Sequence, residues 1–531
     1  MCATLRLSRW LPVVILAWLA GSVAAGAGPA PREVEGGVLP LSNDGMVPDG
    51  VEQAHWPMPF TNLVHAGVTR FSDAGGNQQA CLEGEVTTTL SGLFVHVNDS
   101  CGPISESTSG EVLDLGTSPG TDCMVAPGSS PGNTRSARSS FYELNRIRAM
   151  AQGHLPENAW LQQTLTANVN IPFSCGASWN GVSVNFFRAG GGCSNTGELA
   201  AVFDHEWGHG LDDNGVNPSI SNPSEGIADV YAALRLSTSC IGRGFRATNC
   251  GGYGDPCLDC TGIRDLDWAK RASGLPHTVT WIDANCGSGG SAPCGGSVHC
   301  ESAVYAEALW DLWNRDLPAV YGMSLDTARE VAAQLIFRGA GPVGSWFTCN
   351  QGSGGCNAAG GYLNFLTVDD DDGNLANGTP HMQAIFAAFD RHGIACPTPA
   401  VQDSGCAGTP AQPPSVAASG VDQGAELVWS AVSGASSYRI YRTDGVAGCA
   451  YGKELVGETA ATTFTDHGLK NGRSYDYVVI PMGATDTCFG PASACTEVVP
   501  QAGGGDPCAS GLIFADGFES GDTSLWSTVV P

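Results

Sequence analysis

Two histidines separated by three residues form the pattern of this sequence with the clearest chemical meaning. His205 and His209 stand four positions apart, so on a helix both imidazoles lie on one face, about one turn from each other. This spacing suits two ligands of a single Zn²⁺, and the intervening Glu206 has the position of a general base for a zinc-activated water. Such a short pattern also arises by chance, so its meaning depends on further ligands downstream.

A second acidic pair follows the two histidines. Glu225 and Asp229 are also four positions apart, at the start of a helix expected over 224–238. A catalytic zinc site has three protein ligands and one open position, so Glu225 is expected to be the third ligand. Asp229 is expected to accept the second ring N–H of a ligand histidine. The alternatives are a capping role for Glu225, a solvated Asp229, a structural metal, and a third ligand from Asp212 or Asp213.

Two other groups of residues are candidates for function. His299 precedes a helix expected over 300–315, where an imidazole could stabilise the oxyanion of a tetrahedral intermediate; a structural role is the alternative. The acidic run Asp370, Asp371 and Asp372 precedes a glycine, and clustered carboxylates of this kind suit Ca²⁺. The residue spacing of an EF-hand is absent, so a solvated acidic turn is an equal alternative to calcium binding.

The composition is that of an exported protein. Residues 1–27 have the charged, apolar and small-residue zones of a secretory signal peptide, and no later apolar run is long enough to span a bilayer. The chain has 21 cysteines, and the even number left after Cys2 is removed favours disulfides. The net charge of −28 argues against binding to nucleic acid or anionic lipid. We therefore predict a secreted, extracellular protein without a transmembrane anchor.

Hydrophobic periodicity predicts both strands and helices before residue 398. Alternation of apolar residues predicts half-buried strands over 85–90 and 93–97, and strands are also expected over 169–171 and 182–187. Apolar residues at helical spacing, with Asn195 as a cap for the histidine helix, predict the following helices: 139–152, the segment from 195 through the two histidines, 224–238, 300–315, 325–338 and 380–392.

Residues 414–500 differ from the chain that precedes them. Short β-prone runs separated by turn residues predict a β-sandwich, with Trp429, Tyr438 and Tyr475 at core-like positions. The pattern resembles a fibronectin type III domain, a module that more often spaces or binds than catalyses. We expect it to bind a surface or a polymeric substrate. Sixteen cysteines lie from Cys81 to Cys406 and four from Cys449 onward, so each part could close its own disulfides, but cysteine spacing does not determine the connectivity.

The zinc-site residues and two further segments resemble the thermolysin-like and fungalysin-like gluzincin metallopeptidases. The two segments are the turn Ala177–Gly181 before a strand and the Val–His pair that ends at His299, and the resemblance spans roughly residues 56–398. It implies an α+β fold of two lobes, β-rich and then helical, with the histidine helix at the floor of the cleft. It also implies Glu225 as third ligand, Asp229 as its support and His299 as the histidine of the transition state.

The resemblance further predicts where a substrate binds. The strand over 182–187 is expected to be the sheet edge that pairs with an extended substrate backbone. The predicted substrate contacts are Ala177, Trp179, Val184 and Asn185. Two features depart from the family: Gly176 replaces the usual asparagine of the turn, and no tyrosine lies between the second histidine and the third ligand. Tyr231 and Tyr253 are the candidates to replace that tyrosine.

We therefore predict a secreted zinc-dependent endopeptidase that hydrolyses peptide bonds. The alternative is a catalytically weak or inactive peptidase scaffold that acts as an extracellular adhesion or binding protein; a third possibility is the same zinc chemistry on a narrow peptide or another acyl compound. The predicted segments are a signal peptide over 1–27, an N-terminal arm or pro-segment remnant over 28–55, a metallopeptidase domain over 56–398, a linker over 399–413, the fibronectin type III-like domain over 414–500, and a Gly-rich linker with an acidic tail over 501–531.

Overall fold

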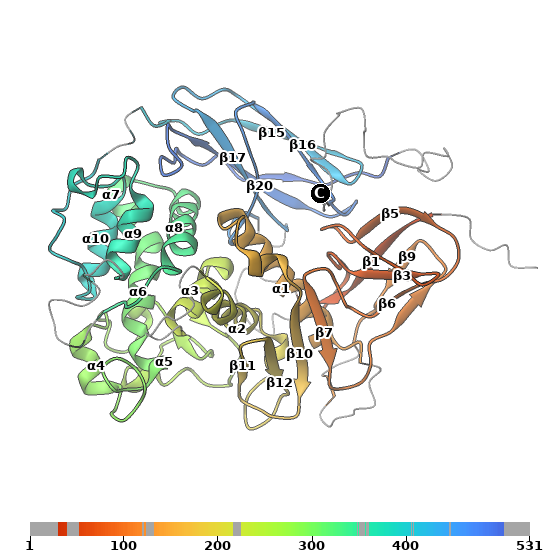
Figure 1. The fold of residues 1–531 in the computed structure, drawn as a ribbon, viewed down its shortest axis with the longest axis horizontal. Coiled ribbons are helices and arrows are strands. Elements are labelled where there is room, and N and C mark those ends of the chain that lie inside the picture. The colour runs from red at the N-terminus through yellow and green to blue at the C-terminus, as the bar shows by residue number, and fades with distance from the viewer. Residues whose placement is uncertain are drawn as a thin grey trace, which may run out of the picture.

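The structure is a computed structural model, and the fold it describes is a mixture of helices and several small sheets (Figure 1). This confirms the predicted combination of helices and sheets. The expected signal peptide and acidic tail lie outside the described residues. The residues described are 30–39, 52–118, 122–123, 132–215, 225–347, 349, 356, 360–404, 406, 408–444 and 448–503.

The N-terminal strands form two small sheets. The first has the order β2 (Gln53–Pro57), β1 (Ala30–Val38) and β5 (Asn77–Leu82), with β9 (Val112–Asp114) parallel to β1. The second has the order β4 (Val68–Phe71), β3 (Asn62–His65), β6 (Val86–Thr88) and β8 (Glu106–Thr108). Within the segment predicted as an N-terminal arm or pro-segment remnant over 28–55, β1 pairs with three strands, and its buried valines, Val34 and Val38, belong to the main core. The described part of this segment is therefore an integral strand.

A third sheet lies beside the helix that carries the two histidines. Its order is β11 (Ala177–Trp179), β12 (Ser183–Phe187), β10 (Leu165–Ile171) and β7 (Val95–Asp99). Because β12 pairs with both β11 and β10, the prediction that β12 is the edge strand is wrong. The edge is β11, which packs against helix α2 (Ala200–Asp213) (Figure 1). With three residues, β11 is too short for its periodicity to be recognised.

Each predicted helical segment contains a helix in the structure, and further helices lie outside those segments. Helix α1 (Arg135–His154) buries its predicted apolar face. Asn195 caps a short 3-10 turn over Thr196–Glu198 rather than the histidine helix, so α2 begins only at Ala200. The remaining helices are α3 (Glu225–Leu236), α4 (Val279–Asn285), α5 (Val298–Glu301), α6 (Ala303–Asp311), α7 (Leu317–Tyr321), α8 (Leu325–Ala340), α9 (Gly361–Asp369) and α10 (Met382–Arg391). A two-residue hairpin, β13 (Cys240–Ile241) with β14 (Arg264–Asp265), follows α3.

Helices α2 and α3 approach each other closely at a glycine of the histidine helix. A Cβ atom on Gly208 would lie 2.9 Å from the Cα atom of Ala228 and 3.1 Å from the ring of Tyr231. Only a residue without a side chain permits this contact between the two backbones. The glycine therefore brings the histidine face of α2 against the start of α3, where the predicted third ligand lies.

Residues 416–498 form a β-sandwich, as the sequence predicts for residues 414–500. One sheet has the order β15 (Val416–Val421), β16 (Gly424–Trp429) and β19 (Thr463–His467); the other has the order β18 (Glu454–Thr459), β17 (Ser437–Thr443), β20 (Tyr475–Met482) and β21 (Thr496–Val498). The predicted core aromatics Trp429, Tyr438 and Tyr475 are each 4% exposed and lie in the core that the two sheets share.

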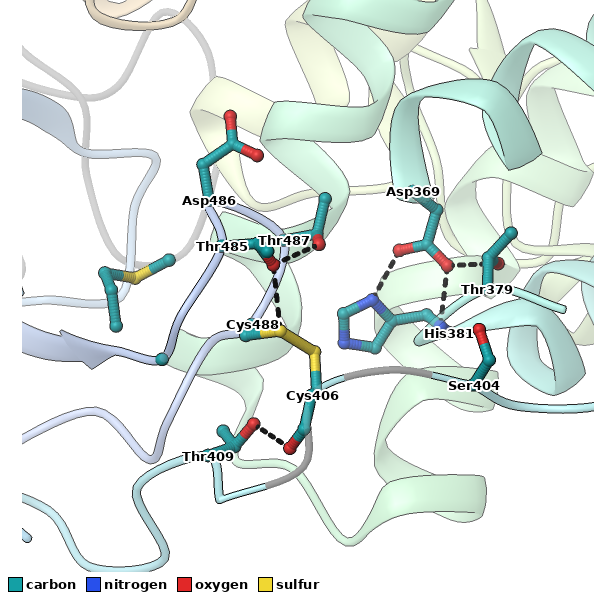
Figure 2. Close-up of a disulfide and its surroundings, with 12 residues drawn as sticks. Asp369, Thr379, His381, Ser404, Cys406, Thr409, Thr485, Asp486, Thr487 and Cys488 are labelled. Atoms are coloured by element: carbon teal, nitrogen blue, oxygen red, sulfur yellow. Dashed lines mark hydrogen bonds and ion pairs between the residues drawn. A yellow bond between two sulfur atoms is a disulfide. The ribbon is translucent and has the colours of Figure 1, made fainter. Parts of the chain in front are cut away.

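Disulfides are numerous in the described part of the chain. Nine of them join cysteines whose placement is described, a density typical of proteins that fold in an oxidising compartment. Cys406 of the linker pairs with Cys488 of the sandwich (Figure 2), so one disulfide joins the two parts of the chain between which the cysteines were divided. Among the described residues, the helices all lack the length or apolar character required to cross a bilayer.

His154, the last residue of α1, is expected to make the protein less stable in mild acid. His154 is buried and stacked on Phe337, and burial together with the charges of Arg338 and Arg439 lowers its pKa to about 3. The unfolded chain has the ordinary histidine pKa of about 6.5, so below that pH only the unfolded state takes up the proton. Stability from this group is therefore complete above pH ~6.5 and is lost as pH falls towards 3.

We expect the free energy of unfolding to fall by about 2 kcal/mol between pH 7 and pH 5 on account of this histidine alone. His154→Phe keeps the aromatic stacking and removes the titrating group. Urea unfolding of both proteins at the two pH values measures the difference. An equal pH dependence in the variant would show that the histidine does not cause the acid sensitivity.

Candidate metal centre

The predicted metal ligands meet at one point between α2 and α3. The Nε2 atoms of His205 and His209 lie 3.1 Å apart. An oxygen of Glu225 lies 3.3 Å from the first of these nitrogens, and its other oxygen lies 3.8 Å from the second. One ligand atom from each of the three residues falls within 4.8 Å of the others. The structure thus brings together three side chains whose identity is that of a two-histidine, one-carboxylate zinc site.

These separations fit a tetrahedral ion. Zinc bonds to nitrogen and oxygen of about 2.0–2.2 Å place neighbouring ligands about 3.3–3.6 Å apart. The two shorter measured separations, 3.1 Å and 3.3 Å, lie at that value or just below it, and the longest, 3.8 Å, is just above. The three side chains are half-buried or buried, since their side-chain exposures are 11% for His205, 13% for His209 and 15% for Glu225. Side chains with such low exposure are largely shielded from water.

Asp229 occupies the supporting position that the sequence predicts. Its Oδ1 atom lies 2.9 Å from Nδ1 of His205, which fixes the ring with Nε2 directed at the cluster. The structure adds a residue that sequence reasoning missed: the guanidinium of Arg264 donates to both oxygens of Asp229, at 2.5 Å and 2.8 Å. Arg264 also lies 3.7 Å from Glu225. Arg264 belongs to the two-residue strand β14, which is too short to be predicted from a sequence pattern.

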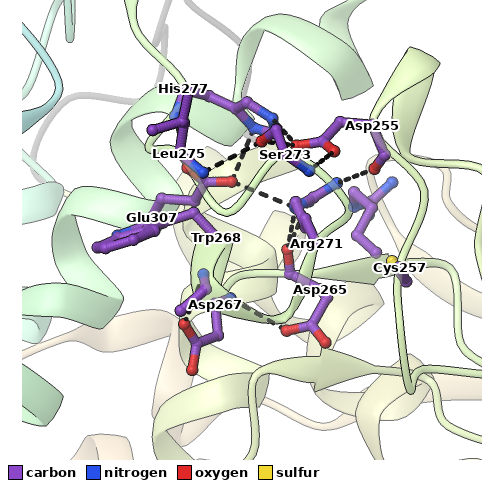
Figure 3. Close-up of polar contacts among 12 residues, drawn as sticks. Asp255, Cys257, Asp265, Asp267, Trp268, Arg271, Ser273, Leu275, His277 and Glu307 are labelled. Carbon is purple, nitrogen blue, oxygen red and sulfur yellow. Dashed lines mark hydrogen bonds and ion pairs between the residues drawn. The ribbon is translucent and has the colours of Figure 1, made fainter.

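A buried polar network holds the hairpin that presents this arginine (Figure 3). Arg271 donates through Nε to the carbonyl oxygen of Asp265, the residue next to Arg264, at 3.0 Å. The same guanidinium lies 3.5 Å from Glu307 of α6, and Glu307 lies 2.8 Å from the ring of His277. His277 in turn contacts Asp255 at 3.1 Å. The network connects the segment after α3 to helix α6, and this connection fixes the position of the hairpin.

The electrostatics of the cluster favour a cation. Burial lowers the pKa of His205, but hydrogen bonds with Asp229 and Glu225 outweigh burial and raise that pKa to about 10. Burial and the neighbouring His205 charge lower the pKa of His209 to about 3. Burial raises the pKa of Glu225, but hydrogen bonds with His205 and His299 hold it far below the usual range. The carboxylates of Glu225 and Asp229 therefore create a negative potential at the cluster. In the absence of metal it stabilises a proton on His205, and a divalent cation at the same place would be stabilised in the same way.

Glu206, the predicted general base, is buried beside the edge strand. Burial raises its pKa to about 7, although the positive charge of His205 and a backbone hydrogen bond with Trp179 of β11 partly oppose that rise. A carboxylate with a pKa near neutrality can both accept and release a proton. The contact with Trp179 also places the carboxylate next to the sheet edge on which a substrate backbone would lie.

His299 lies at the same cluster, on α5. Its Nε2 atom is 3.1 Å from an oxygen of Glu225, and its side chain is 47% exposed. The imidazole thus reaches both the predicted third ligand and solvent. This placement is consistent with a histidine that faces a bound substrate, and its role as an oxyanion donor stays a prediction.

The predicted substrate contacts divide between two strands. Ala177 and Trp179 belong to the edge strand, opposite Phe186 and Val184 of β12, and the backbone N–H of Trp179 donates to Glu206. Val184 is fully buried, and the side-chain amide of Asn185 donates to the carbonyl oxygens of Ser178 and Ser183 within the sheet. The open edge is therefore offered by the first pair, and the second pair lies one strand behind it.

The competing candidates for the metal and for the missing tyrosine lie elsewhere. Asp213 accepts a hydrogen bond from the indole of Trp179 at 2.6 Å, and Asp212 is buried with its pKa raised to about 8 by burial and by Asp213. Neither joins the cluster of the two histidines. Tyr231 is 2% exposed and stacked on Phe337, so it is a core residue. Tyr253 is 39% exposed, and its replacement of the missing tyrosine stays a prediction.

The acidic run after α9 also gathers in space. Asp370, Asp371 and Asp372 can place one oxygen each within 4.8 Å of the others on the protein surface. Asp372 already accepts hydrogen bonds from the backbone of Asn374 and the amide of Asn377, which is typical of an acidic turn. Asp369, by contrast, is buried and bound to His381 and Thr379 (Figure 2). Calcium binding by Asp370, Asp371 and Asp372 stays a prediction.

Asp229 gives a graded prediction about metal affinity. Asp229→Asn keeps the shape of the side chain but removes the charge that orients His205 and pairs with Arg264. Loss of such a supporting partner typically weakens metal binding about 10- to 100-fold. A zinc dissociation constant measured by competition with a chelating dye tests this expectation. An unchanged constant would mean that the aspartate has no part in the metal centre.

Comparisons with known proteins concern only a small part of the chain. No family model matches the sequence, and no curated protein matches it. A Fn3-like protein from Clostridium thermocellum is 28% identical over 17% of this chain and 92% of that chain, with a TM-score of 0.15. A human fibronectin type III domain from the KIAA0970 protein is 17% identical over 19% of this chain and 80% of that chain, with a TM-score of 0.16. At these TM-scores the likenesses carry no argument about function.

Proposed function

We propose that this chain is a secreted zinc-dependent endopeptidase of the thermolysin-like or fungalysin-like kind. The observation that carries the proposal is the convergence of His205, His209 and Glu225 within 4.8 Å, with the buried Glu206 on the same helix. The wider arrangement supports it, because N-terminal sheets precede the α2–α3 pair and a helical part follows, the order expected of a two-lobed peptidase of this type. The many disulfides support export.

For each role that zinc-dependent peptide hydrolysis requires, the described part of the chain offers a candidate residue. When bound, Zn²⁺ would polarise a peptide carbonyl and make a water acidic enough to lose its proton near neutral pH. Glu206 would take that proton and deliver it to the leaving nitrogen, and His299 would donate to the developing oxyanion. The edge strand β11 would hold an extended peptide by strand addition. Asp229 and Arg264 keep His205 in the ring orientation that this requires.

Hydrolysis of casein by the purified mature chain tests the proposal. We expect cleavage that stops when a zinc chelator is added and returns when zinc is restored. Intact casein after incubation with zinc-loaded protein would overturn the proposal of a general endopeptidase. Digestion of a peptide library then separates the two remaining readings, since cleavage of a few peptides indicates a narrow peptidase and no cleavage indicates a binding scaffold.

A further inference from the structure

The sheet of the sandwich that contains β17 and β20 is apolar on both faces. Along β20, Tyr477 and Val479 point into the sandwich core, whereas Val478 and Ile480 join the main core of the chain. All eight residues of β20 are buried. A strand covered on both faces belongs to the interior of a fold rather than to the outer wall of a free module.

Polar contacts attach this sheet and its loops to two distant parts of the chain. Lys470 lies 2.7 Å from Glu33 and 2.8 Å from Glu35, both on the N-terminal strand β1. In a second contact, the buried Lys453 lies 2.9 Å from Asp326 and 3.5 Å from Glu330, both on α8. Figure 1 shows the sandwich extending over both regions. It therefore connects the N-terminal sheets to the helical part.

The residue before Lys453 contacts the helix that carries the predicted third ligand. The N–H of Gly452 donates to the carbonyl oxygen of Arg235 at 2.8 Å. Arg235 lies in the last turn of α3, where carbonyl groups have no partner within the helix. The guanidinium of the same arginine lies 2.7 Å from Asp204, the residue before the first histidine ligand, and 2.7 Å from Glu143 of α1.

The contact at Gly452 leaves no space for a side chain. A Cβ atom there would lie 2.7 Å from the Cα atom of Arg235 and 3.0 Å from the carbonyl oxygen of Leu234. The opposing atoms are backbone, so a substitution forces either the loop of the sandwich or the end of α3 to move. Because the two backbones are in direct contact at Gly452, a shift of this loop of the sandwich would displace the end of α3.

We infer that the fibronectin type III-like sandwich is a fixed part of the metal-binding unit, which joins the N-terminal sheet to α8 and sets the C-terminal end of α3, rather than a tether that moves independently. The part of this inference that concerns zinc rests on the proposed function; the part that concerns folding does not. Gly452 and Arg235 are positioning residues, since they act on Glu225 and Asp229 through α3 without touching a substrate.

Calorimetry of the full chain together with zinc affinity tests the inference. We expect the zinc-free wild-type protein to unfold in a single transition that includes the sandwich, whereas an independent domain would give a separate transition. Gly452→Ala is expected to lower the temperature of that single transition by at least about 2 °C. It is also expected to raise the zinc dissociation constant about tenfold, the lower range for a supporting residue.

Gly110→Ala is the matched control, because an added Cβ atom there meets only Thr108 at 3.4 Å. It should leave both measurements unchanged. If Gly452→Ala does not accumulate in folded form, Lys453→Met tests the same interface, since it leaves Glu330 without its cation. A separate sandwich transition that alone shifts in the variants would overturn the inference. Failure of the wild-type chain to bind zinc would instead overturn the proposed function and leave the calorimetric result as the test of the inference.

Discussion

Glu206→Gln should abolish peptide hydrolysis while leaving the metal centre intact. The substitution keeps the size of the side chain and an oxygen that can accept the backbone hydrogen bond from Trp179. It removes the carboxylate that takes the proton from water in the proposed mechanism, because a neutral amide is not a base. General base catalysis contributes about 10²- to 10⁴-fold, so kcat/KM should fall by at least that factor.

The metal content of the variant separates a lost base from a lost site. Zinc affinity should equal that of the wild-type chain, because Glu206 is not among the three clustered ligands. Glu111→Gln is a matched control, since Glu111 is exposed on the N-terminal sheets and should tolerate the same change without loss of activity. Activity that persists in Glu206→Gln would exclude Glu206 as the base.

Glu225→Ala should remove both metal binding and activity. The carboxylate supplies one of three ligands, so zinc affinity should fall by more than the roughly 100-fold that the loss of a supporting residue can cause. The folded state should also lose the stability that bound metal contributes. At a zinc concentration 1,000 times the dissociation constant this contribution is about 4 kcal/mol, and it should vanish in the variant.

Thermal melting with and without zinc measures this effect. The wild-type melting temperature should rise on addition of zinc, and that of Glu225→Ala should not change at the same concentration. Asp229→Asn provides the comparison, because its weaker effect should be overcome by excess zinc. A variant at position 225 that still binds zinc and is still stabilised by it would exclude Glu225 as the third ligand.

The clustering of the candidate ligands could be predicted because the relevant spacings are local. On an α-helix, residues four positions apart share a face, so the pairs His205–His209 and Glu225–Asp229 are each arranged by the helix alone. The sequence does not state that the two helices pack together; that step depends on Gly208, which permits close approach of their backbones. The predicted helices and the sandwich core were recognisable for the same reason, since periodicity is a local signal.

What the sequence did not reveal depends on pairings between distant segments. Arg264 reaches Asp229 from a two-residue strand with no periodicity, and β11 is a sheet edge of only three residues. The sequence does contain a signal for the packing of the sandwich against the rest of the chain. Tyr475–Met482 is an almost continuous apolar run rather than the alternating pattern of a half-exposed strand. The disulfide between Cys406 and Cys488 could not be derived, because cysteine spacing does not determine connectivity.

The zinc content of the purified chain is the most direct test of the central claim. Elemental analysis by mass spectrometry should find about one zinc per wild-type chain and none in a His205→Ala, His209→Ala double variant, because a catalytic site needs both imidazoles in addition to the carboxylate. A wild-type chain that takes up no zinc, or a double variant that retains it, would contradict the assignment of the α2–α3 cluster as the metal centre.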